Sequence, residues 1–235
     1  MAPAEPNLTS KPEIQVGMPD IVKFIRQLGH DLRNHLNAAE LQAAYLAEIV
    51  KDPEASDEIK RLRAMISQVG ESLQSVTTAL SQPRLTAMTY TAVDFVGDLR
   101  EKVAADYPGE TVEWDIQVGD ASMEIDPQAL QPVLMELFAN AFRHGRAEEP
   151  IMVEARAGDG QFVFFMREPK RNFERGTENW GREPLRAITQ GHYGLGLHRS
   201  RAILEAHQGQ LSARYDTAKS SLITTVTLPL SNKRA

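Results

Sequence analysis

Apolar residues in the N-terminal third of the chain recur every three or four positions, which is the spacing of one face of a helix. The first series spans residues 21–50 and predicts one long helix. Asp52 and Pro53 then interrupt it and suit the start of a second helix, because Asp caps a helix N-terminus and Pro fits its first turn. A second series, at 59–80, keeps coiled-coil spacing. We therefore predict an antiparallel helical hairpin over residues 20–84.

The hairpin is expected to form a dimer. Two helices alone leave much of the apolar stripe uncovered, and pairing two hairpins into a four-helix bundle would cover it. We therefore expect a homodimer through residues 20–84. The segment before it, residues 1–19, is rich in Pro and lacks an apolar core, which predicts a flexible tail.

The rest of the chain, residues 88–231, reads as a mixed α/β domain. Alternating patterns predict strands at 111–116, 121–125, 151–157, 161–168, 210–216 and 221–229. Helices are predicted from the cap residue Asp94 to about Tyr107, from Asp126 through Ala141, and from Leu195 to His207 with Gly209 as its C-cap. Residues 169–193 form a long polar segment with few apolar residues, which is typical of a functional or disordered loop.

Composition removes several classes of function. The net charge of -6 gives the chain as a whole no electrostatic reason to bind nucleic acid. The chain has no cysteine, which excludes disulfides, zinc-thiolate sites and thiol catalysis. No run of apolar residues approaches the roughly 20 that a membrane span needs, and the N-terminus does not resemble a signal peptide. We therefore expect a cytoplasmic protein without a membrane segment.

The first candidate for chemistry is the segment 30–37, His-Asp-Leu-Arg-Asn-His-Leu-Asn. His30 lies two positions past Leu28 and therefore off the apolar stripe, with Asn34 one turn later on the same face. An imidazole nitrogen placed in this way can act as a nucleophile. Asp31 can accept its proton, and Asn34 can orient a water or a phosphoryl oxygen. From these residues alone, an ordinary surface histidine explains the pattern equally well.

His35 falls on the apolar stripe, so we interpret it as a core or interface histidine that points inward. It lies five positions from His30, and neither has a cysteine or carboxylate at metal-ligand spacing, so a zinc site is not expected.

The second candidate is a row of polar residues on a predicted helix. Glu136, Asn140 and His144 recur every four positions and therefore share one face. A carboxylate and an amide oxygen suit Mg²⁺ that keeps some of its waters, and a cationic His144 can meet a phosphate. The alternative is a solvated helix face, which the packing residues Leu137 and Ala141 disfavour.

The third candidate is a glycine-rich helix start. Gly194 and Gly196, with Leu195 and Leu197, open the last predicted helix. Glycine lets the backbone approach phosphate closely, and a helix N-terminus offers free N–H groups. A lone Gly-x-Gly is weak evidence, and a simple packing turn is the alternative.

In their order and spacing, these three segments resemble the dimerisation and ATP-binding core of sensor histidine kinases, over about residues 20–230. They correspond to the H-box at 30–36, the N-box at 136–144 and the G2-box at 194–197. The resemblance implies a Bergerat-type (GHKL) α/β sandwich, shared with Hsp90, MutL and gyrase, behind the dimeric four-helix bundle.

The resemblance also implies roles. His30 would be the phosphoacceptor, with Asp31 as the assisting base. Asn140 would hold Mg²⁺ with help from Glu136. The implied cofactors are ATP and Mg²⁺, and the implied partner is a response-regulator receiver domain. The glycines would bind phosphates beneath a lid at 169–193.

The chain differs from the family in the segment that should bind the adenine base of ATP. The family normally has Asp-x-Gly-x-Gly, and here the strand ends in Glu168-Pro169-Lys170. Strand alternation makes Glu168 the best substitute for the Asp, and a defective contact with adenine would weaken binding by a few kcal/mol. The implied nucleotide-binding residues are Glu136, Asn140, His144, Glu168, Gly194, Leu195, Gly196 and Leu197.

The lid segment and its flank are also rich in basic residues, which would either clamp a triphosphate or dock an acidic partner. These residues are Arg167, Lys170, Arg171, Arg175, Arg182 and Arg186.

Three functions stay open at this point. The first is a kinase that phosphorylates His30 from Mg-ATP and passes the phosphoryl group to a response regulator. The second is a histidine phosphotransferase of a phosphorelay, whose ATPase-like domain does not use ATP. The third is a non-catalytic dimeric scaffold or a phosphatase-only regulator. A serine kinase of the anti-sigma type shares the ATP-binding fold, but it has no need of a hairpin that carries a histidine.

Overall fold

A computed structural model of the chain describes residues 17–143, 149–173, 176–182 and 194–231. It divides the chain into two compact units, residues 1–81 and 82–235. The predicted tail lies largely outside the described residues. None of the helices in the described part combines the length and apolar composition that a membrane crossing requires.

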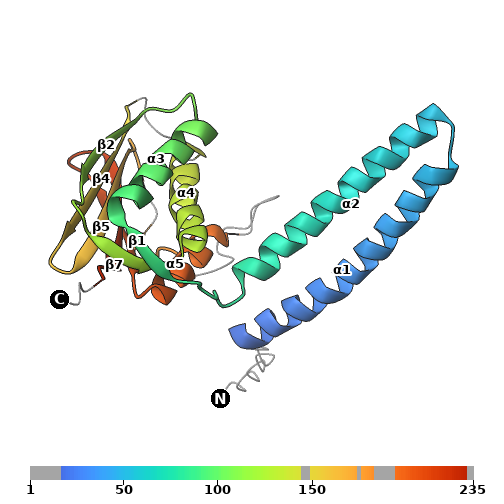
Figure 1. Cartoon of the computed structure of the whole chain (residues 1–235), viewed down its shortest axis with the longest axis horizontal. Helices are drawn as coiled ribbons and strands as arrows, with labels where there is room; N and C mark the ends of the chain where they lie inside the picture. The colour runs from blue at the N-terminus through green and yellow to red at the C-terminus, as the bar shows by residue number, and fades with distance from the viewer. Residues whose placement is uncertain (1–16, 144–148, 174–175, 183–193, 232–235) are drawn as a thin grey trace, which may run out of the picture. The chain divides into compact units, whose positions relative to one another are not determined.

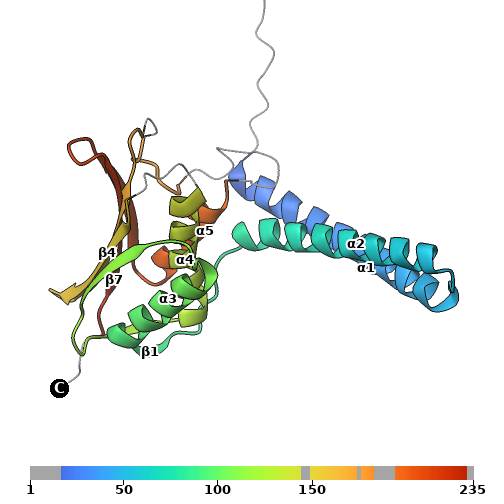
Figure 2. The ribbon, with the colours of Figure 1, turned by 90° about the horizontal axis from the view of Figure 1, so that it is seen from above.

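The first unit is a hairpin of two long helices, α1 (Met18–Ile49) and α2 (Pro53–Ala79), which run side by side (Figures 1 and 2). The predicted turn is confirmed, since the Asp52 side chain accepts a hydrogen bond from the backbone N–H of Ala55 at 2.9 Å. Pro53 follows in the first helical turn, where its missing N–H costs no hydrogen bond.

The two helices are in close contact near His30. A Cβ atom added to Gly29 would lie 2.6 Å from the Cγ2 atom of Thr77, so only glycine fits there. Ala43 and Ile59 are also buried in the hairpin. Nearer to the turn between the helices, Arg63 of α2 forms an ion pair with Glu40 of α1 at 2.7 Å.

His35, predicted to be a core or interface histidine, does not lie in the core of the single hairpin, and its place in a dimer interface stays a prediction. His35 is exposed, as are Leu28 (43%) and Leu32 (42%) on the same stripe. The face of α1 that is buried against α2 includes Gly29 and Ala43, whereas Leu28, Leu32 and His35 lie outside it. The stripe therefore remains uncovered within one chain.

The second unit contains a five-stranded sheet with the order β2-β4-β5-β7-β6. Its strands are β2 (Val112–Gln117), β4 (Ile151–Gly158), β5 (Gln161–Pro169), β6 (Gln210–Asp216) and β7 (Ser221–Pro229). β2 and β4 are parallel, and the other neighbouring strands are antiparallel.

A separate pair of strands, β1 (Met88–Thr91) and β3 (Ser122–Ile125), forms a small antiparallel sheet. β1 was not predicted, because it has only four residues and its first two are exposed.

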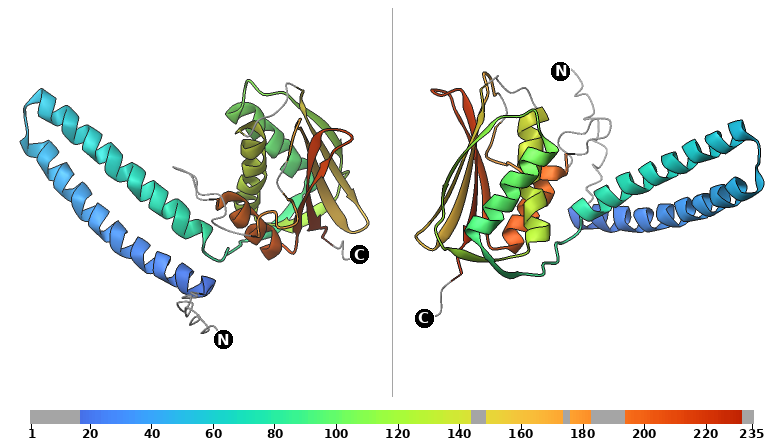
Figure 3. Two further views of the ribbon diagram at one scale, coloured as in Figure 1. Left: turned by 180° about the vertical axis from the view of Figure 1, so that it is seen from behind. Right: turned by 45° about the horizontal axis from the view of Figure 1, so that its top comes forward.

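Three helices cover one face of the five-stranded sheet (Figures 2 and 3): α3 (Ala92–Asp106), α4 (Pro127–Arg143) and α5 (Gly196–Ala206). The core between helices and sheet is rich in aromatic side chains, and the fully buried ones include Phe95, Phe138, Phe162 and Phe164. The predicted fold class, a helical hairpin followed by an α/β domain, is confirmed.

Two predicted helix ends need correction. The N-cap of α3 is Thr91, whose hydroxyl accepts the backbone N–H of Asp94 at 3.2 Å, so Asp94 lies within the first turn. At the end of α5 the left-handed residue is Gln208 (φ 59°), and Gly209 follows it. Gly209 is needed there for a different reason, since a Cβ atom would lie 2.5 Å from the carbonyl oxygen of Thr227.

Asp126 connects the start of α4 to two other segments of the second unit. Its carboxylate accepts the backbone N–H groups of Thr86 (2.8 Å) and Ala129 (3.1 Å). Its own N–H donates to Nε2 of buried His207, whose Nδ1–H donates to the Ile203 carbonyl (2.8 Å). The hydrogen bond from Thr86, with smaller help from the others, lowers the pKa of the Asp126 carboxyl.

Replacing Asp126 by Asn should destabilise the second unit by about 1–2 kcal/mol at pH 7, because an amide NH₂ group would face an N–H donor. Since the pKa is lowered on folding, the carboxylate stabilises the fold above about pH 4, and this stabilisation is lost as the pH falls through the lowered pKa. Urea unfolding at pH 7 and at pH 3 tests this. The exposed Asp159→Asn variant is the control. An equal loss for Asp126→Asn at both pH values would contradict the assignment.

Candidate functional site

Helix α4 places its polar side chains away from the sheet. Phe138 has no exposed surface and lies edge-on to Phe164, with ring centroids 6.3 Å apart. This contact turns Glu136 and Asn140 to another side of the helix, where the Asn140 amide donates to the Glu136 carboxylate at 3.0 Å. The third predicted member of this row, His144, lies outside the described residues.

The start of α5 lies against the carboxylate of Glu136. A Cβ atom on Gly196 would overlap the Oε1 atom of Glu136, so a larger residue there would displace the Glu136 carboxylate. Gly194 has a left-handed backbone (φ 63°), which also favours glycine. Leu195 is buried, and Leu197 faces a cavity. The structure therefore brings the predicted N-box and G2-box residues together.

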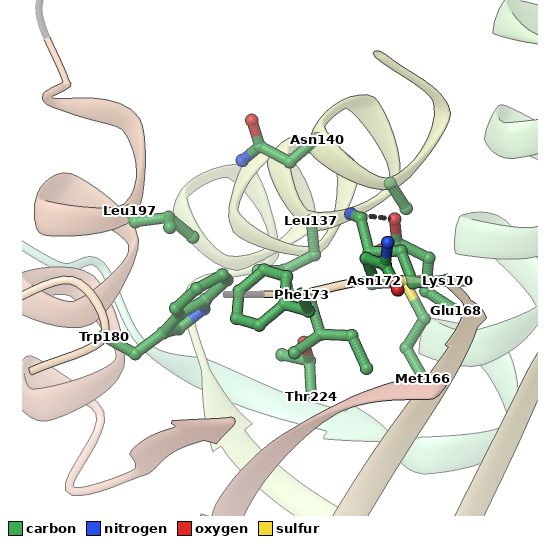
Figure 4. Close-up of a pocket in the computed structure, with 12 residues that line it drawn as sticks. Leu137, Asn140, Met166, Glu168, Lys170, Asn172, Phe173, Trp180, Leu197 and Thr224 are labelled. Atoms are coloured by element: carbon green, nitrogen blue, oxygen red, sulfur yellow. Dashed lines mark hydrogen bonds and ion pairs between the residues drawn. The ribbon is translucent and has the colours of Figure 1, made fainter. Parts of the chain in front are cut away.

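A cavity of about 480 Å³ lies between α4, β5, β7, α5 and the chain that follows β5 (Figure 4). Three predicted site residues line it, namely Asn140, Glu168 and Leu197. Sequence reasoning missed most of the other lining residues, which include Met166, Asn172, Phe173, Trp180 and Thr224.

A buried ion pair occupies the position where the base of ATP was expected to be read. Glu168 is 3% exposed and Lys170 is 8% exposed, and the Lys170 ammonium group is bonded to Oε1 of Glu168 (Figure 4). Backbone contacts hold the lysine in place, since its N–H donates to the Ser220 carbonyl (2.7 Å) and its carbonyl accepts from the Tyr215 hydroxyl (2.9 Å). A carboxylate can accept about four hydrogen bonds, so this pairing does not exhaust the capacity of Glu168.

Two aromatic rings extend the wall of the cavity. Phe173 lies 5.7 Å from Trp180 and 5.9 Å from Tyr215 between ring centroids, and the Lys170 ammonium lies 5.7 Å from the Phe173 centroid. Two of the few apolar residues in the described parts of the predicted loop thus line the cavity. The sequence prediction relied on regularly spaced apolar residues. Isolated aromatic residues in a polar segment have no such spacing, so their place in the cavity wall was not predicted.

The indole N–H of Trp180 is buried and has no acceptor among the described residues. Such a donor is rare in native proteins and is consistent with a ligand that supplies the acceptor. Trp180 is held by its own backbone, because its carbonyl accepts from the Arg201 guanidinium at 2.9 Å.

A bound Mg²⁺ fits the polar end of this site. Among the described residues, no three His, Cys, Asp or Glu side chains are grouped as metal ligands. Asn140 and Glu136 are the residues there that could hold the ion, and water and phosphate oxygens would supply the other ligands, as is usual for Mg²⁺.

In the hairpin, the three predicted catalytic residues lie together. Nδ1 of His30 is 3.3 Å from Oδ1 of Asp31 and 3.4 Å from Nδ2 of Asn34. Gln27 orients Asp31 by donating to the same oxygen at 2.9 Å. When Nδ1–H donates to Asp31, the lone pair resides on Nε2, and the His30 side chain is 67% exposed.

Comparison with known families identifies the second unit. Residues 125–232 match the family described as histidine kinase-, DNA gyrase B- and HSP90-like ATPases. This match spans most of the second unit, which we call the ATPase domain after the family that it resembles. No curated protein sequence matches the chain.

Solved structures extend the similarity to the hairpin and the ATPase domain together. Full-length ShkA in complex with AMPPNP has a TM-score of 0.67 at 16% identity, over 91% of this chain and 47% of that chain. The histidine kinase AdeS of Acinetobacter baumannii has a TM-score of 0.53 at 16% identity, over 86% of this chain and 98% of that chain. The mycobacterial sensor histidine kinase MprB has a TM-score of 0.50 at 15% identity, over 62% of this chain and 98% of that chain. The chain spans about half the length of ShkA, and at these identities the likeness establishes the fold.

The Glu168–Lys170 pair of the ATPase domain should behave as a buried ion pair. Glu168→Leu alone leaves an unpaired buried ammonium group and should cost about 3–5 kcal/mol in free energy of unfolding, and the double variant Glu168→Leu/Lys170→Met should recover most of this loss. Chemical denaturation measures all three proteins.

The matched control is the Glu154–Arg156 pair of β4, which has the same spacing in sequence but is more exposed. Breaking that pair should cost less than about 1 kcal/mol. A double variant at 168 and 170 that is as unstable as the single one would show that the two charges are not coupled.

Proposed function

We propose that the chain is a histidine protein kinase of a two-component system. In this proposal Mg-ATP occupies the cavity of the ATPase domain, its γ-phosphoryl group moves to Nε2 of His30, and an Asp of a response-regulator receiver domain then accepts it. The observation that carries the proposal is the cavity itself, which unites Asn140, Glu168 and Leu197 from three distant segments.

The lining of the cavity suits a nucleotide. The carboxylate of Glu168 is an acceptor for an exocyclic amino group, and the rings of Phe173 and Trp180 offer faces and edges to a flat base. At the other end, the N-terminus of α5 favours negatively charged phosphate groups. When bound at Asn140, Mg²⁺ would neutralise part of the phosphate charge.

The residues around His30 suit its role as the phosphoacceptor. Asp31 holds Nδ1–H, which keeps the lone pair on exposed Nε2 and stabilises the positive charge that the ring gains during attack. The new N–P bond forms as the bond from the γ-phosphorus to the bridging oxygen of ADP breaks. Asp31 then takes up the Nδ1 proton as the base.

A homodimer through residues 20–84 would cover the exposed stripe of the hairpin. Large apolar side chains on both helices have a third or more of their surface exposed, namely Leu28, Leu32, Leu46, Leu62 and Val69. A four-helix bundle of two hairpins is the arrangement that buries such positions.

The second candidate is a histidine phosphotransferase that does not use ATP, and the Glu168–Lys170 pair favours it. An ammonium group beside the base-reading carboxylate repels an amino donor and could exclude adenine. Phosphoryl groups would then reach His30 from a receiver domain instead of from ATP.

Incubation with γ-labelled ATP and Mg²⁺ should give acid-labile, base-stable phosphate on the chain, because phosphohistidine has this stability. His30→Ala should abolish the label. His35→Ala, a change five residues along the same helix at another exposed histidine, should retain it. Labelling that survives His30→Ala would overturn the assignment of the phosphoacceptor.

Calorimetric titration with Mg-ATP separates the two candidates. A kinase should bind at sub-millimolar concentration, and Asn140→Ala should weaken binding by about tenfold or more through loss of a metal ligand. Absence of binding to the wild-type chain, combined with phosphorylation of His30 by a phosphorylated receiver domain, would establish the phosphotransferase.

A further inference from the structure

His30 lies between two cavities of the hairpin that share a second residue, Arg26. One, of about 240 Å³, reaches across to α2. The other lies along α1 towards Asp20 and Lys23. Arg26 is one helical turn before His30 and Arg33 is about one turn after it, so both guanidinium groups flank the imidazole ring.

The smaller cavity, which we call the arginine pocket, is lined by basic and neutral polar side chains. Besides His30, its lining residues are Arg26, Arg33, Gln74, Thr77, Thr78 and Ser81. No acidic side chain lines it. Asp31 belongs to a different side of His30, where it bonds to Gln27 and to Nδ1 of the ring. Guanidinium groups without a competing carboxylate favour an oxyanion, above all one with several oxygens.

Helix packing builds the arginine pocket. The close approach at Gly29 brings Thr77 of α2 beside His30. Arg33 is oriented across the groove, because its guanidinium group donates to the side-chain oxygen of Gln74. The pocket therefore exists before any ligand is bound, which reduces the entropy cost of binding.

Two of the three hydroxyl groups that line the pocket already donate to backbone carbonyls. The Thr77 hydroxyl donates to the Leu73 carbonyl (3.0 Å), and the Ser81 hydroxyl donates to the Thr77 carbonyl (2.7 Å). Arg26, by contrast, makes no hydrogen bond or ion pair with any residue in the described part of the chain. Its donors are the ones available for an anion.

We propose that the arginine pocket receives the phosphoryl group that His30 carries, with Arg26 as the positioning residue that holds the phosphoryl oxygens. The volume suffices, since a water molecule takes roughly 30 Å³ of liquid and the pocket is several times larger. A cation beside the ring also disfavours protonation of the phosphorylated imidazole, the step that makes the ring a good leaving group. Arg26 therefore speeds loading of His30 by neutralising charge on the phosphoryl oxygens, and it slows hydrolysis by disfavouring protonation of the ring. This inference rests on the proposed function only in taking His30 as the phosphoacceptor, and not in taking ATP as the donor.

Phosphoramidate tests the pocket without ATP. Its N–P bond breaks and ammonia leaves, while Nε2 of His30 forms a new N–P bond and the ring loses its Nδ1 proton to solvent through Asp31. The full-length chain is loaded in this way, the donor is removed, and ³¹P NMR follows loading and decay of phosphohistidine. The His30 signal is identified by its absence in His30→Ala.

Arg26→Ala should shorten the lifetime of phospho-His30 and slow its formation by roughly tenfold, the effect of losing one charge-assisted hydrogen bond. Arg26→Lys, which keeps the charge without the planar donors, should fall between Arg26→Ala and wild type. Arg61→Ala is the matched control, because this exposed arginine of α2 pairs with Glu58 and lines neither cavity. It should behave as wild type.

Equal loading and lifetime in the wild-type chain, Arg26→Ala and the double variant Arg26→Ala/Arg33→Ala would overturn the proposal. Failure of ATP labelling together with Arg26-dependent loading by phosphoramidate would leave the pocket established and would reject the kinase. Circular dichroism of each variant shows whether the helices are retained.

Discussion

The packing of α4 against the five-stranded sheet is the contact on which the ATPase domain and its candidate site depend. Phe138 is completely buried and touches rings from β2, β5 and α4 itself, which fixes the rotation of the helix about its axis. Each residue along a helix turns by about 100°, so a slip of one position would carry Asn140 away from the cavity. The same rotation lays the Glu136 carboxylate against Gly196, where a larger residue would displace that carboxylate. The packing of the apolar face of α4 thus positions Glu136 and Asn140 on its polar face.

The pair formed by Glu168 and Lys170 controls what the cavity can bind. Separating two buried charges leaves one of them unpaired and costs several kcal/mol, more than a single hydrogen bond to a base returns. A nucleotide can therefore bind well only if the pair persists and the carboxylate accepts one further donor. The chemistry at His30 does not share this constraint, since its contacts to Asp31 and Asn34 lie within α1. Phosphoryl transfer through His30 is consistent with either source of the phosphoryl group.

Periodic patterns allowed the prediction of both long helices, the three helices of the ATPase domain and the five strands of its sheet. They also placed Glu136 and Asn140 on one face and His30 in solvent. They failed where structure depends on single residues or on the partner surface. His35 lies outside the hairpin interior because the face of α1 that packs on α2 is the one with Gly29 and Ala43. Phe173 and Trp180 are isolated aromatics without a period. The Lys170 contact was visible in principle, since alternate residues of a strand share a face, but the predicted strand ended at Glu168.

The most direct test of this account is a crystal structure of the chain with Mg²⁺ and a non-hydrolysable ATP analogue. We predict the base in the cavity beside Phe173 and Trp180, with its amino group bonded to Glu168 while Lys170 stays in contact with the same carboxylate. The metal ion should lie on the side-chain oxygen of Asn140, and the phosphates should lie at the start of α5. An empty cavity at millimolar analogue, or a nucleotide bound elsewhere, would contradict the account and would leave His30 dependent on another phosphoryl donor.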